Sequence, residues 1–501
     1  LSPTAMKKSY KSSCIITRLL FLFIFFIALT AEAQVGIGNT DPAASSMLDI
    51  TSTSKGFLVP RMTTVQRNAV DGPANSLLVY DTTLKSFFYY DTTTTAWVRI
   101  NSASNQRNNY KLVKSAADLA PELAAGGGSK YLLQTNTLYE INGLITLAFP
   151  IDLNNAYVSG LDATEDILTK TSGPIFQGTT GGSIRNVTLT GGGSAFAITG
   201  GSSLLVQNTV ITNFANVGSI SNVGLYFGNI VQFVGNTTGI TYSNIGNLLL
   251  NNQAWLDTNN GTFETFTGTF GLIEKVSGFS SVNGSDVALD VSSNPTVGSG
   301  VLQGTVFSGT TSAPNGYIKK YTTGSYPGYS FTNSWTVNCP GIPRESDDVS
   351  SGNIYYNGTI TTGFVQTVTN GNEFNLSGTS PNLNTTTAVN LFRVSSPQNN
   401  RLTYLGKKTR TFQINASLSV RGNSGTGDYY AFFIKKNGAT GTSLVETNTL
   451  MRVNNTSDIS SNSISGTVEL APNEYVEIWG QRLIGSGTTS ITVFSLNVNL
   501  K

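Results

Sequence analysis

The sequence predicts an all-β protein, with a right-handed parallel β-helix shaft followed by a jelly-roll β-sandwich head. Only 12% of its 501 residues are charged, whereas 52 residues are glycine and 39% are hydrophobic. Short runs of Val, Ile, Phe and Tyr are separated by Gly, Asn, Ser and Thr, a pattern typical of many short strands joined by turns. The hydrophobic content differs from that of disordered chains, and the length allows two or three domains.

Residues 131–315 contain an internal repeat that predicts the β-helix. Short apolar segments follow four asparagines that lie 22, 21 and 18 residues apart: Asn186, Asn208, Asn229 and Asn247. A period near 20 with about three short strands suits one coil of a parallel β-helix. We expect these asparagines at matching corners, and four aliphatic residues in one strand layer that points mostly into the core: Val187, Val210, Val231 and Leu248. A stack of antiparallel hairpins is the alternative.

Residues 386–501 predict a separate head domain. They contain eight candidate strands, with apolar residues alternating in 412–420 and 491–498. Eight antiparallel strands of this length suit a double-sheet jelly roll. Its surplus aromatic residues predict an interface between copies, with filling of the monomer core as the alternative; these residues are Phe432, Phe433, Trp479 and Phe494. Residues 316–385 contain several prolines and are expected to form a capping or transition region.

The N-terminus predicts a cleaved signal peptide over residues 6–33. Basic residues precede an apolar run from Leu19 to Leu29, and Ala31 and Ala33 occupy the positions that a signal peptidase reads. This run is shorter than the roughly 20 residues that a membrane-spanning helix needs. We therefore expect a mature chain that begins at Gln34, has no membrane span, and is extracellular or on the outer cell surface.

Residues 34–100 carry the elements VGIGNTDP, STSKGFLVPRMT and LLVYDT. These elements resemble a module at the start of secreted surface proteins and fibre-like proteins of Bacteroidota, and a similar module occurs in tail fibres of their phages. The resemblance implies a fibre-like context and no particular chemistry. Asx-type turns are expected at Asp81 and Asp91, and a polar linker is expected over 101–130.

Two further resemblances concern the shaft and the head. The segment TLYEINGLITLAFPIDLNNAYVSGL is similar to the opening of the β-helix in tail-spike and pectin-lyase-like proteins. The strand rhythm of residues 386–501 resembles that of the trimeric C1q/TNF-like heads that end many fibres. The second resemblance implies a homotrimer.

The sequence contains no histidine, which excludes Ser-His-Asp triads, histidine-ligated zinc and imidazole acid–base catalysis. Cys339 is the one cysteine of the expected mature chain and does not form a thiolate metal site by itself. No phosphate-binding glycine loop is found, and a net charge of +2 gives no electrostatic footprint for nucleic acid. We therefore expect no metal, no cofactor and no nucleic-acid partner.

Catalysis by a β-helix that degrades polysaccharides would require paired carboxylates on one face. Acidic residues are sparse between residues 174 and 310. Glu264 and Glu274 are ten residues apart and are not expected to face each other, whereas Asp286 and Asp290 are expected on a solvated sheet face. The sequence therefore predicts that the chain is not an enzyme.

The predicted ligand-binding residues form an aromatic loop that begins just after the shaft. Tyrosine and tryptophan offer large, rigid contact areas to sugars and other surfaces. The candidates are Tyr317, Tyr321, Tyr326, Tyr329 and Trp335. The alternative is that they form a hydrophobic lid on the end of the β-helix.

Taken together, these features predict an exported cell-surface fibre or adhesin-like protein that contacts glycans or other surfaces through its C-terminal region. Homotrimers are expected, with oligomerisation and recognition assigned to the head. A phage tail-fibre or receptor-binding protein is the alternative, against which the signal peptide argues because phage fibres assemble in the cytoplasm. A polysaccharide-degrading β-helix enzyme is a further alternative.

Overall fold

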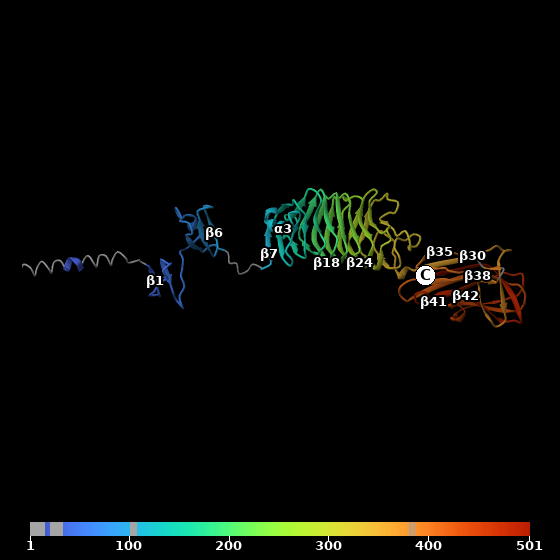
Figure 1. Cartoon of the computed structure of the whole chain (residues 1–501). Helices are drawn as coiled ribbons and strands as arrows, with labels where there is room; N and C mark the ends of the chain where they lie inside the picture. The colour runs from blue at the N-terminus through green and yellow to red at the C-terminus, as the bar shows by residue number, and fades with distance from the viewer. Residues whose placement is uncertain (1–15, 21–33, 101–107, 380–381, 384–385) are drawn as a thin grey trace, which may run out of the picture. The chain divides into compact units, whose positions relative to one another are not determined.

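The computed structural model describes residues 16–20, 34–100, 108–379, 382–383 and 386–501 (Figure 1). The chain divides into two compact units, residues 1–106 and 107–501. Apart from residues 16–20, the predicted signal peptide lies outside the described residues. No helix in the described part of the chain has both the length and the apolar character needed to cross a membrane.

The first unit contains a small four-stranded sheet and a two-stranded parallel ladder. The ladder pairs β1 (Val35–Ile37) with β2 (Leu48–Ile50). The sheet has the order β3-β4-β5-β6, and its elements are β3 (Arg61–Met62), α2 (Thr64–Asn68), β4 (Leu78–Asp81), β5 (Ser86–Asp91) and β6 (Ala96–Arg99). The expected Asx turns are confirmed, because the Asp81 and Asp91 side chains accept backbone N–H groups two residues on, at 2.9 and 2.8 Å.

The second unit begins with a parallel β-solenoid whose coils have three strand-bearing sides, here called faces A, B and C. Faces A and B belong to one 14-stranded sheet, and face C is a nine-stranded sheet. Every strand pair within these sheets is parallel, as a stack of coils requires. The predicted β-helix is therefore present.

Face A runs through ten strands among the described residues: β7 (Tyr110–Val113), β9 (Leu138–Ile141), β12 (Tyr157–Ser159), β15 (Gly182–Arg185), β18 (Gly201–Thr212), β20 (Val223–Val234), β22 (Asn247–Trp255), β24 (Thr269–Val282), β26 (Thr296–Gln303) and β29 (Trp335–Asn338). Face B is formed by the second halves of β18, β20, β22 and β24, together with β10 (Leu144–Thr146), β13 (Ile167–Lys170), β16 (Thr188–Gly191) and β27 (Val306–Gly309). Face C contains β8 (Tyr131–Leu132), β11 (Ile151–Asp152), β14 (Pro174–Gly178), β17 (Ser194–Ile198), β19 (Asn216–Ser221), β21 (Ile240–Ser243), β23 (Thr262–Thr267), β25 (Val287–Asp290) and β28 (Ile318–Lys319).

The corner between faces A and B sets the true period of the solenoid. One residue per coil adopts a left-handed conformation there, with φ between 48° and 60°. These residues are Asn186, Asn208, Ile230, Asn252 and Ser277. Asparagine is common at this corner because its short polar side chain tolerates the left-handed region, and the Asn208 amide donates to Asn186 Oδ1 of the previous coil at 3.1 Å.

The predicted asparagine register is therefore correct for two of its four members. Asn229 lies one residue before its corner, beside Gln207, and Asn247 lies at the start of a face A segment, beside Leu225. Three members of the predicted strand layer are buried as expected: Val187, Val231 and Leu248. Leu248, however, lies on face A, and Val210 pairs with Thr188 and points away from the core, half-exposed. Val187 follows its corner residue by one position, whereas Val210 follows its corner residue by two. Because successive residues of a strand point to opposite sides of the sheet, this difference of one residue turns Val210 outward.

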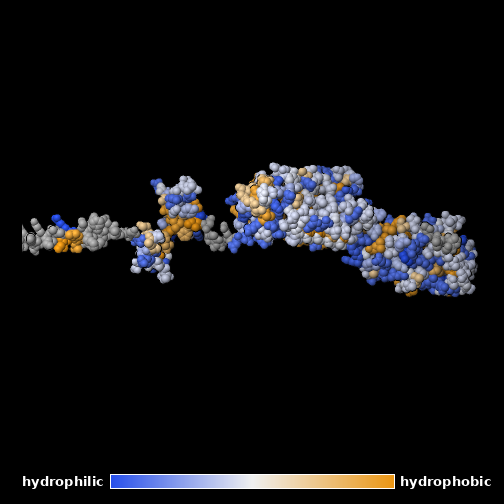
Figure 2. Space-filling view, viewed as in Figure 1, coloured by the Kyte–Doolittle hydropathy of each residue, from blue (hydrophilic) through white to orange (hydrophobic). Residues whose placement is uncertain are grey.

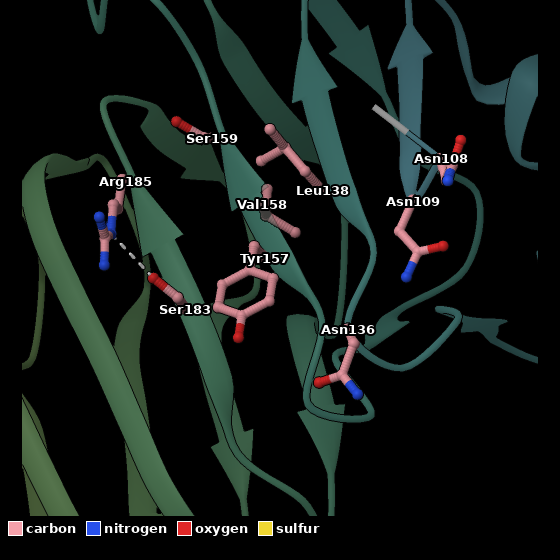
Figure 3. Close-up of a pocket in the computed structure, with 9 residues that line it drawn as sticks. All are labelled: Asn108, Asn109, Asn136, Leu138, Tyr157, Val158, Ser159, Ser183 and Arg185. Carbon is pink, nitrogen blue, oxygen red and sulfur yellow. Dashed lines mark hydrogen bonds between the residues drawn. The ribbon is translucent and has the colours of Figure 1, made fainter. Parts of the chain in front are cut away.

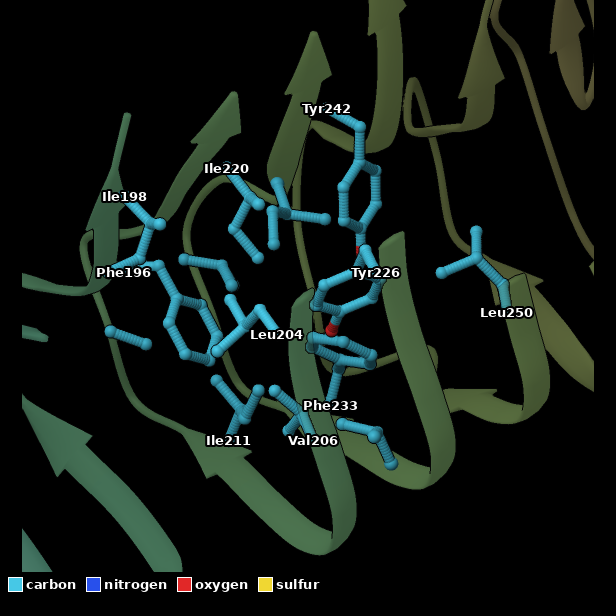
Figure 4. Packing of buried hydrophobic residues seen from close by; sticks show 14 of the residues in the cluster. Phe196, Ile198, Leu204, Val206, Ile211, Ile220, Tyr226, Phe233, Tyr242 and Leu250 are labelled. Atoms are coloured by element: carbon cyan, nitrogen blue, oxygen red, sulfur yellow. The ribbon is translucent and has the colours of Figure 1, made fainter. Parts of the chain in front are cut away.

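Side chains from all three faces meet in one continuous core (Figure 4). Leu204 and Val206 come from face A, Ile211 from face B, and Phe196 and Ile220 from face C, and all five are buried. Equivalent residues of successive coils stack on one another. Phe233 and Trp255, for example, are paired in register, and their ring centroids lie 3.7 Å apart in nearly parallel planes.

Two fully buried asparagines form a hydrogen-bonded ladder inside the solenoid. The Asn236 amide donates to Asn259 Oδ1 at 2.8 Å, and Asn236 Oδ1 accepts the backbone N–H of Phe214 at 3.1 Å. Asn259 in turn donates to the backbone oxygen of Phe233 at 2.7 Å. These bonds satisfy backbone groups where the chain leaves face B, so the amides hold successive turns in register.

The N-terminal end of the solenoid is covered by η2 (Ala116–Leu119) and α3 (Ala120–Ala125), within the segment predicted as a polar linker. Leu119 is buried in the solenoid core. Glu122 accepts a hydrogen bond from the Tyr139 hydroxyl at 2.9 Å and pairs with Lys111 at 2.6 Å. This short helical segment therefore caps the first coil.

The C-terminal part is an antiparallel β-sandwich of two six-stranded sheets. One sheet contains β30 (Ser351–Asn357), β31 (Phe364–Thr369), β35 (Thr387–Phe392), β38 (Arg410–Gly422), β41 (Ser460–Leu470) and β43 (Thr488–Leu500). The other contains β32 (Glu373–Asn375), β36 (Val394–Ser395), β37 (Leu402–Tyr404), β39 (Tyr429–Lys436), β40 (Thr442–Arg452) and β42 (Tyr475–Ile484). The remaining elements are η3 (Asp347–Val349), η4 (Gly438–Thr440) and a small ladder of β33 (Gly378–Thr379) and β34 (Asn382–Leu383).

The strands expected within 386–501 are found, and three more come from the segment predicted as a capping region: β30, β31 and β32. The four surplus aromatic residues are buried within one chain, as the alternative interpretation expected. Phe432 lies in the main core, and Phe433 and Trp479 form a small cluster with Ala431. These aromatics therefore leave no exposed surface for an interface between heads. A jelly-roll connectivity stays a prediction.

The register predicts opposite outcomes for two neighbouring substitutions on β18. Ile211 is fully buried between Leu189 and Phe233, whereas Val210 points outward. We expect Ile211→Asp to lower the free energy of unfolding by several kcal/mol (roughly 3 or more), because the core offers the carboxylate no partner. Val210→Asp should cost less than about 1 kcal/mol. Chemical denaturation of both variants tests this, and equal losses would contradict the assigned register.

Candidate functional site

Apolar side chains gather on the surface of the first unit, where Figure 2 shows them in orange. Phe57, Leu58 and Val65 are 64–78% exposed, although each is large and hydrophobic. Other exposed apolar residues of this unit are Val35, Ile37, Met47, Leu48, Ile50, Leu84, Phe87 and Ile100. Phe57 and Leu58 also line a hollow of about 260 Å³ with Tyr80 and Phe87. Exposed apolar residues of this kind occur at protein–protein, membrane and ligand contacts, and we call this set the N-terminal apolar surface.

A second candidate site is a groove on the outer side of face A, near its N-terminal end (Figure 3). Its volume is about 540 Å³, and its lining includes Asn136, Leu138, Tyr157, Ser183 and Arg185. Leu138, Tyr157 and Ser183 are register partners on three successive strands. The Arg185 guanidinium donates to Ser183 Oγ at 3.0 Å and forms no ion pair with any described residue. The groove thus combines an exposed ring, amides and a free cation.

The five predicted ligand-binding residues fall into two groups, two that are buried and three that are partly exposed. Trp335 is fully buried, and its indole N–H donates to the Tyr321 hydroxyl at 3.1 Å. Tyr321 is 3% exposed and donates to the backbone oxygen of Pro295 at 2.8 Å. These two side chains, with Phe331, close the last coil of the solenoid as a hydrophobic lid. The lid that the sequence analysis kept as its alternative is therefore formed by these residues.

The other three predicted residues remain partly exposed. Tyr326 and Tyr329 pack on Phe392 of the head, with ring centroids 5.5 and 3.9 Å away. Tyr317 donates its hydroxyl proton to the backbone oxygen of Gly309 at 2.9 Å. The contacts of Tyr326 and Tyr329 show that the loop joins the solenoid to the sandwich.

Beside this loop lies a third hollow, the loop groove, with a volume of about 480 Å³. It is lined by Asn315, Lys319, Lys320, Tyr326 and their neighbours. The Lys319 ammonium pairs with Asp290 at 3.0 Å, whereas Lys320 is exposed and forms no ion pair among the described residues. An amide, an aromatic ring and a free cation therefore line the groove, and polar groups of this kind set orientation in ligand sites.

The joint between the solenoid and the head is held by buried charges. Arg393 of the head forms an ion pair with Asp347 and donates to the backbone oxygens of Trp335 and Glu345. Asp347 also accepts the backbone N–H groups of Lys407 and Lys408, each at 2.9 Å. These contacts lower the pKa of Asp347 although burial opposes them. Mostly buried ion-pair and hydrogen-bond contacts of Arg393 and Asp347 therefore hold the sandwich on the last coil.

Glu345 belongs to the same joint and is 1% exposed. Its two carboxylate oxygens accept the backbone N–H groups of Ser330 and Phe331 at 2.7 and 3.0 Å. Burial raises the pKa of Glu345 to about 7, because the desolvation of the charged form outweighs these hydrogen bonds and the nearby Arg393 charge. Glu345 therefore titrates near neutral pH while it holds the aromatic loop.

The sequence analysis missed an ion pair inside the solenoid. Lys275 Nζ lies 2.9 Å from Glu264 Oε2, and both side chains are completely buried. Sequence alone does not show that the strand position of Glu264 points inward. Asp286, expected on a solvated face, is buried and accepts the backbone N–H of Gly261 at 2.7 Å, whereas Asp290 points outward to Lys319. These carboxylates lie in separate environments and do not form a pair.

Cys339 is buried and free, and burial raises the pKa of its thiol. Among the described residues, no group of three His, Cys, Asp or Glu side chains is arranged to hold a metal ion. The acidic run of residues 162–166 instead organises a turn, in which Asp166 accepts the backbone N–H groups of Gly143 and Leu161.

A family model described as a phage tail-like trimerisation region matches residues 36–112. This match covers all of the N-terminal apolar surface except Val35, and it ends in β7. It places a trimerisation region at the opposite end of the chain from the head, to which the sequence analysis assigned oligomerisation. Comparison with curated proteins finds no match for the chain.

Among solved structures, the chain is similar to the enzymatically active domain of tailspike protein 4 of bacteriophage CBA120, with 11% identity, a TM-score of 0.25, and coverage of 88% of this chain and 77% of the other. It is also similar to the tailspike protein of Acinetobacter baumannii phage AM24, with 11% identity, a TM-score of 0.16, and coverage of 85% and 91%. At these scores the superpositions carry no argument about ligands.

The prediction that the chain is not an enzyme is corrected: one of the similar tailspikes is described as enzymatically active, and the premise of the prediction does not exclude glycan cleavage. The physical reason lies in the premise. Absence of histidine excludes imidazole chemistry only, and the prediction considered paired carboxylates, which carry out glycoside hydrolysis, only within residues 174–310. A solenoid that lacks histidine is therefore compatible with glycan cleavage.

The Glu345 pKa predicts a pH dependence of stability. Its folded value of about 7 lies above the ordinary 4.5, so between these values the folded state retains a proton that the unfolded state has lost. The resulting stabilisation is complete below about pH 4.5 and is lost as the pH rises through 7. We expect Glu345→Gln to reduce this loss, by about 1–3 kcal/mol. Denaturation at several pH values measures it; identical slopes for both proteins would contradict this assignment.

Proposed function

We propose that this chain is a trimeric, tail-fibre-like receptor-binding protein in which residues 36–112 hold three copies together. The observation that carries the proposal is the coincidence of the trimerisation-region match with the N-terminal apolar surface. A small sheet with side chains such as Leu58 exposed exchanges water for apolar contact when copies associate. The solenoid then acts as a rigid shaft, and the sandwich as its terminal domain.

The proposal includes export to the cell surface, supported by the signal sequence over residues 6–33. A bacterial adhesin is exported, whereas a phage tail component assembles in the cytoplasm. We rank a tail-fibre-like architecture first because the family match names a phage tail-like region, and the signal sequence favours export and display of a fibre with this architecture.

The proposal also assigns glycan contact to the loop groove. Lys320 and Asn315 provide hydrogen-bond donors, and Tyr326 provides an aromatic surface on which a sugar ring can stack. The free ammonium group of Lys320 favours acidic glycans over neutral ones. Tyr317 and Tyr329 remain candidates, whereas Tyr321 lines the groove as a buried side chain that accepts a hydrogen bond from Trp335.

Oligomeric mass tests the central proposal. We expect the full chain to have three times the monomer mass by light scattering at micromolar concentration. Leu58→Glu should weaken the trimer at least tenfold, because it places a charge in an apolar contact. The matched control Thr53→Glu, at another exposed position of the same unit, should leave the mass unchanged. A wild-type monomer would refute the proposal.

Glycan binding is tested on an array of acidic and neutral polysaccharides. We expect binding to acidic glycans that falls about tenfold in Lys320→Ala, since one charge-assisted contact is lost. The control variant is Lys55→Ala, which removes an exposed lysine of the first unit. Release of new reducing ends during incubation would add cleavage to binding, and binding that is unaltered in Lys320→Ala would exclude the loop groove.

A further inference from the structure

We propose that the outer side of face A packs against the same side of two other copies of this chain. This inference rests on the trimer of the proposed function and identifies a second surface that closes it. The argument comes from the side chains that point outward on three neighbouring rows of the sheet.

The central outward row of face A is apolar on the three successive strands β18, β20 and β22. Leu205, Phe227 and Leu249 are register partners on β18, β20 and β22, and each is half-buried while the residues on either side of it point into the core. Leu225 and Leu272 flank this row on one side, and Val276 flanks it on the other. The row continues as the charged Glu274 on β24 and then as Val301 on β26. Seven aliphatic or aromatic side chains therefore lie in a strip on the outside of the solenoid, which also contains the polar Asn247, Asn251 and Glu274.

The corresponding outward row of face C consists of polar and charged side chains from β19 to β28. Ser219, Thr241 and Thr265 are register partners there, followed by Asp290 and Lys319, which form an ion pair. Both rows belong to the same coils and need the same strand geometry. Strand propensity alone would allow the same hydroxyl-bearing residues on both faces, so the apolar side chains of face A indicate contact with another surface.

The groove of Figure 3 extends the strip toward the N-terminus. Leu138 and Tyr157 continue the central outward row, and the small Ser183 leaves the hollow between Tyr157 and Leu205. In the adjacent row, Glu140 and Arg185 are present without an ion-pair partner among the described residues. A neighbouring copy presents both an apolar side chain for the hollow and charges of opposite sign, so the surface is complementary to itself.

The sequence position of the trimerisation match supports a second copy as the occupant. The match ends at residue 112, inside β7, which is the first strand of face A. Three copies joined through residues 36–112 therefore present three face A strips at a high effective concentration. Even modest apolar contact then suffices for the strips to associate.

Site-directed crosslinking in the full chain tests this inference. Leu249→Cys places a thiol in the strip, and Thr241→Cys places one on face C at a comparable half-buried position. With a short bis-maleimide, we expect Leu249→Cys to yield a dimer band containing up to two thirds of the chains, since one of three thiols is left without a partner. Thr241→Cys should match the wild-type background, whose native Cys339 is buried.

Light scattering of the same samples separates the two proposals. A trimer in which Leu249→Cys crosslinks no better than Thr241→Cys would overturn the face A interface and leave the proposed function intact. A monomer would overturn both. A charge substitution gives a second readout: Phe227→Glu should make the trimer dissociate at a concentration at least tenfold higher than Thr241→Glu does, and equal behaviour would also count against face A.

Discussion

The structure depends on one constraint: no coil of the solenoid buries its apolar side chains unless the next coil stacks on it in register. Each coil contributes only a few residues per face, too few for a core of its own. Left-handed corner residues such as Asn186 and Asn208 keep the turn between faces A and B alike in successive coils. Because the turns are alike, Phe233 meets Trp255 and Ile211 meets Phe233 in the interior. Conformation at a corner thus determines packing in the core.

Polar side chains buried inside the solenoid are also aligned from one coil to the next. Asn236 and Asn259 are one coil apart and satisfy each other and the backbone around them. Lys275 and Glu264 come from faces A and C and pair across the interior, although burying two charges is costly. Removal of either partner would leave an uncompensated charge, so the pair also specifies which strands face one another. We have no physical account of why this coil contains an ion pair in place of the apolar residues found above and below it.

The fold class and the period of the coils could be predicted from the sequence, but the direction in which each side chain points could not. All-β structure, a coil length near 20 residues and the strands of the head followed from turn residues and apolar runs. Register did not, because Asn208 and Asn229 look alike in sequence while one lies at the corner and the other beside it. Tyr321 and Trp335 were recognised as a group with Tyr326, but their burial depends on the last coil, which is distant in sequence. The N-terminal apolar surface escaped notice because exposure of Phe57 and Leu58 is a property of the folded unit.

A stack of coils also has two ends, each with unpaired strand edges that invite association with other chains. At the N-terminal end α3 covers the first coil, and its Glu122 is tied to Tyr139. At the C-terminal end the aromatic lid closes the core, and the Arg393 and Asp347 network fastens the sandwich over it. Growth of the solenoid along its axis is therefore blocked by intramolecular contacts at both ends. The lateral surfaces remain for association. This architecture therefore suits side-by-side packing of a limited number of copies, as a trimerisation region implies, better than a fibre that grows end to end.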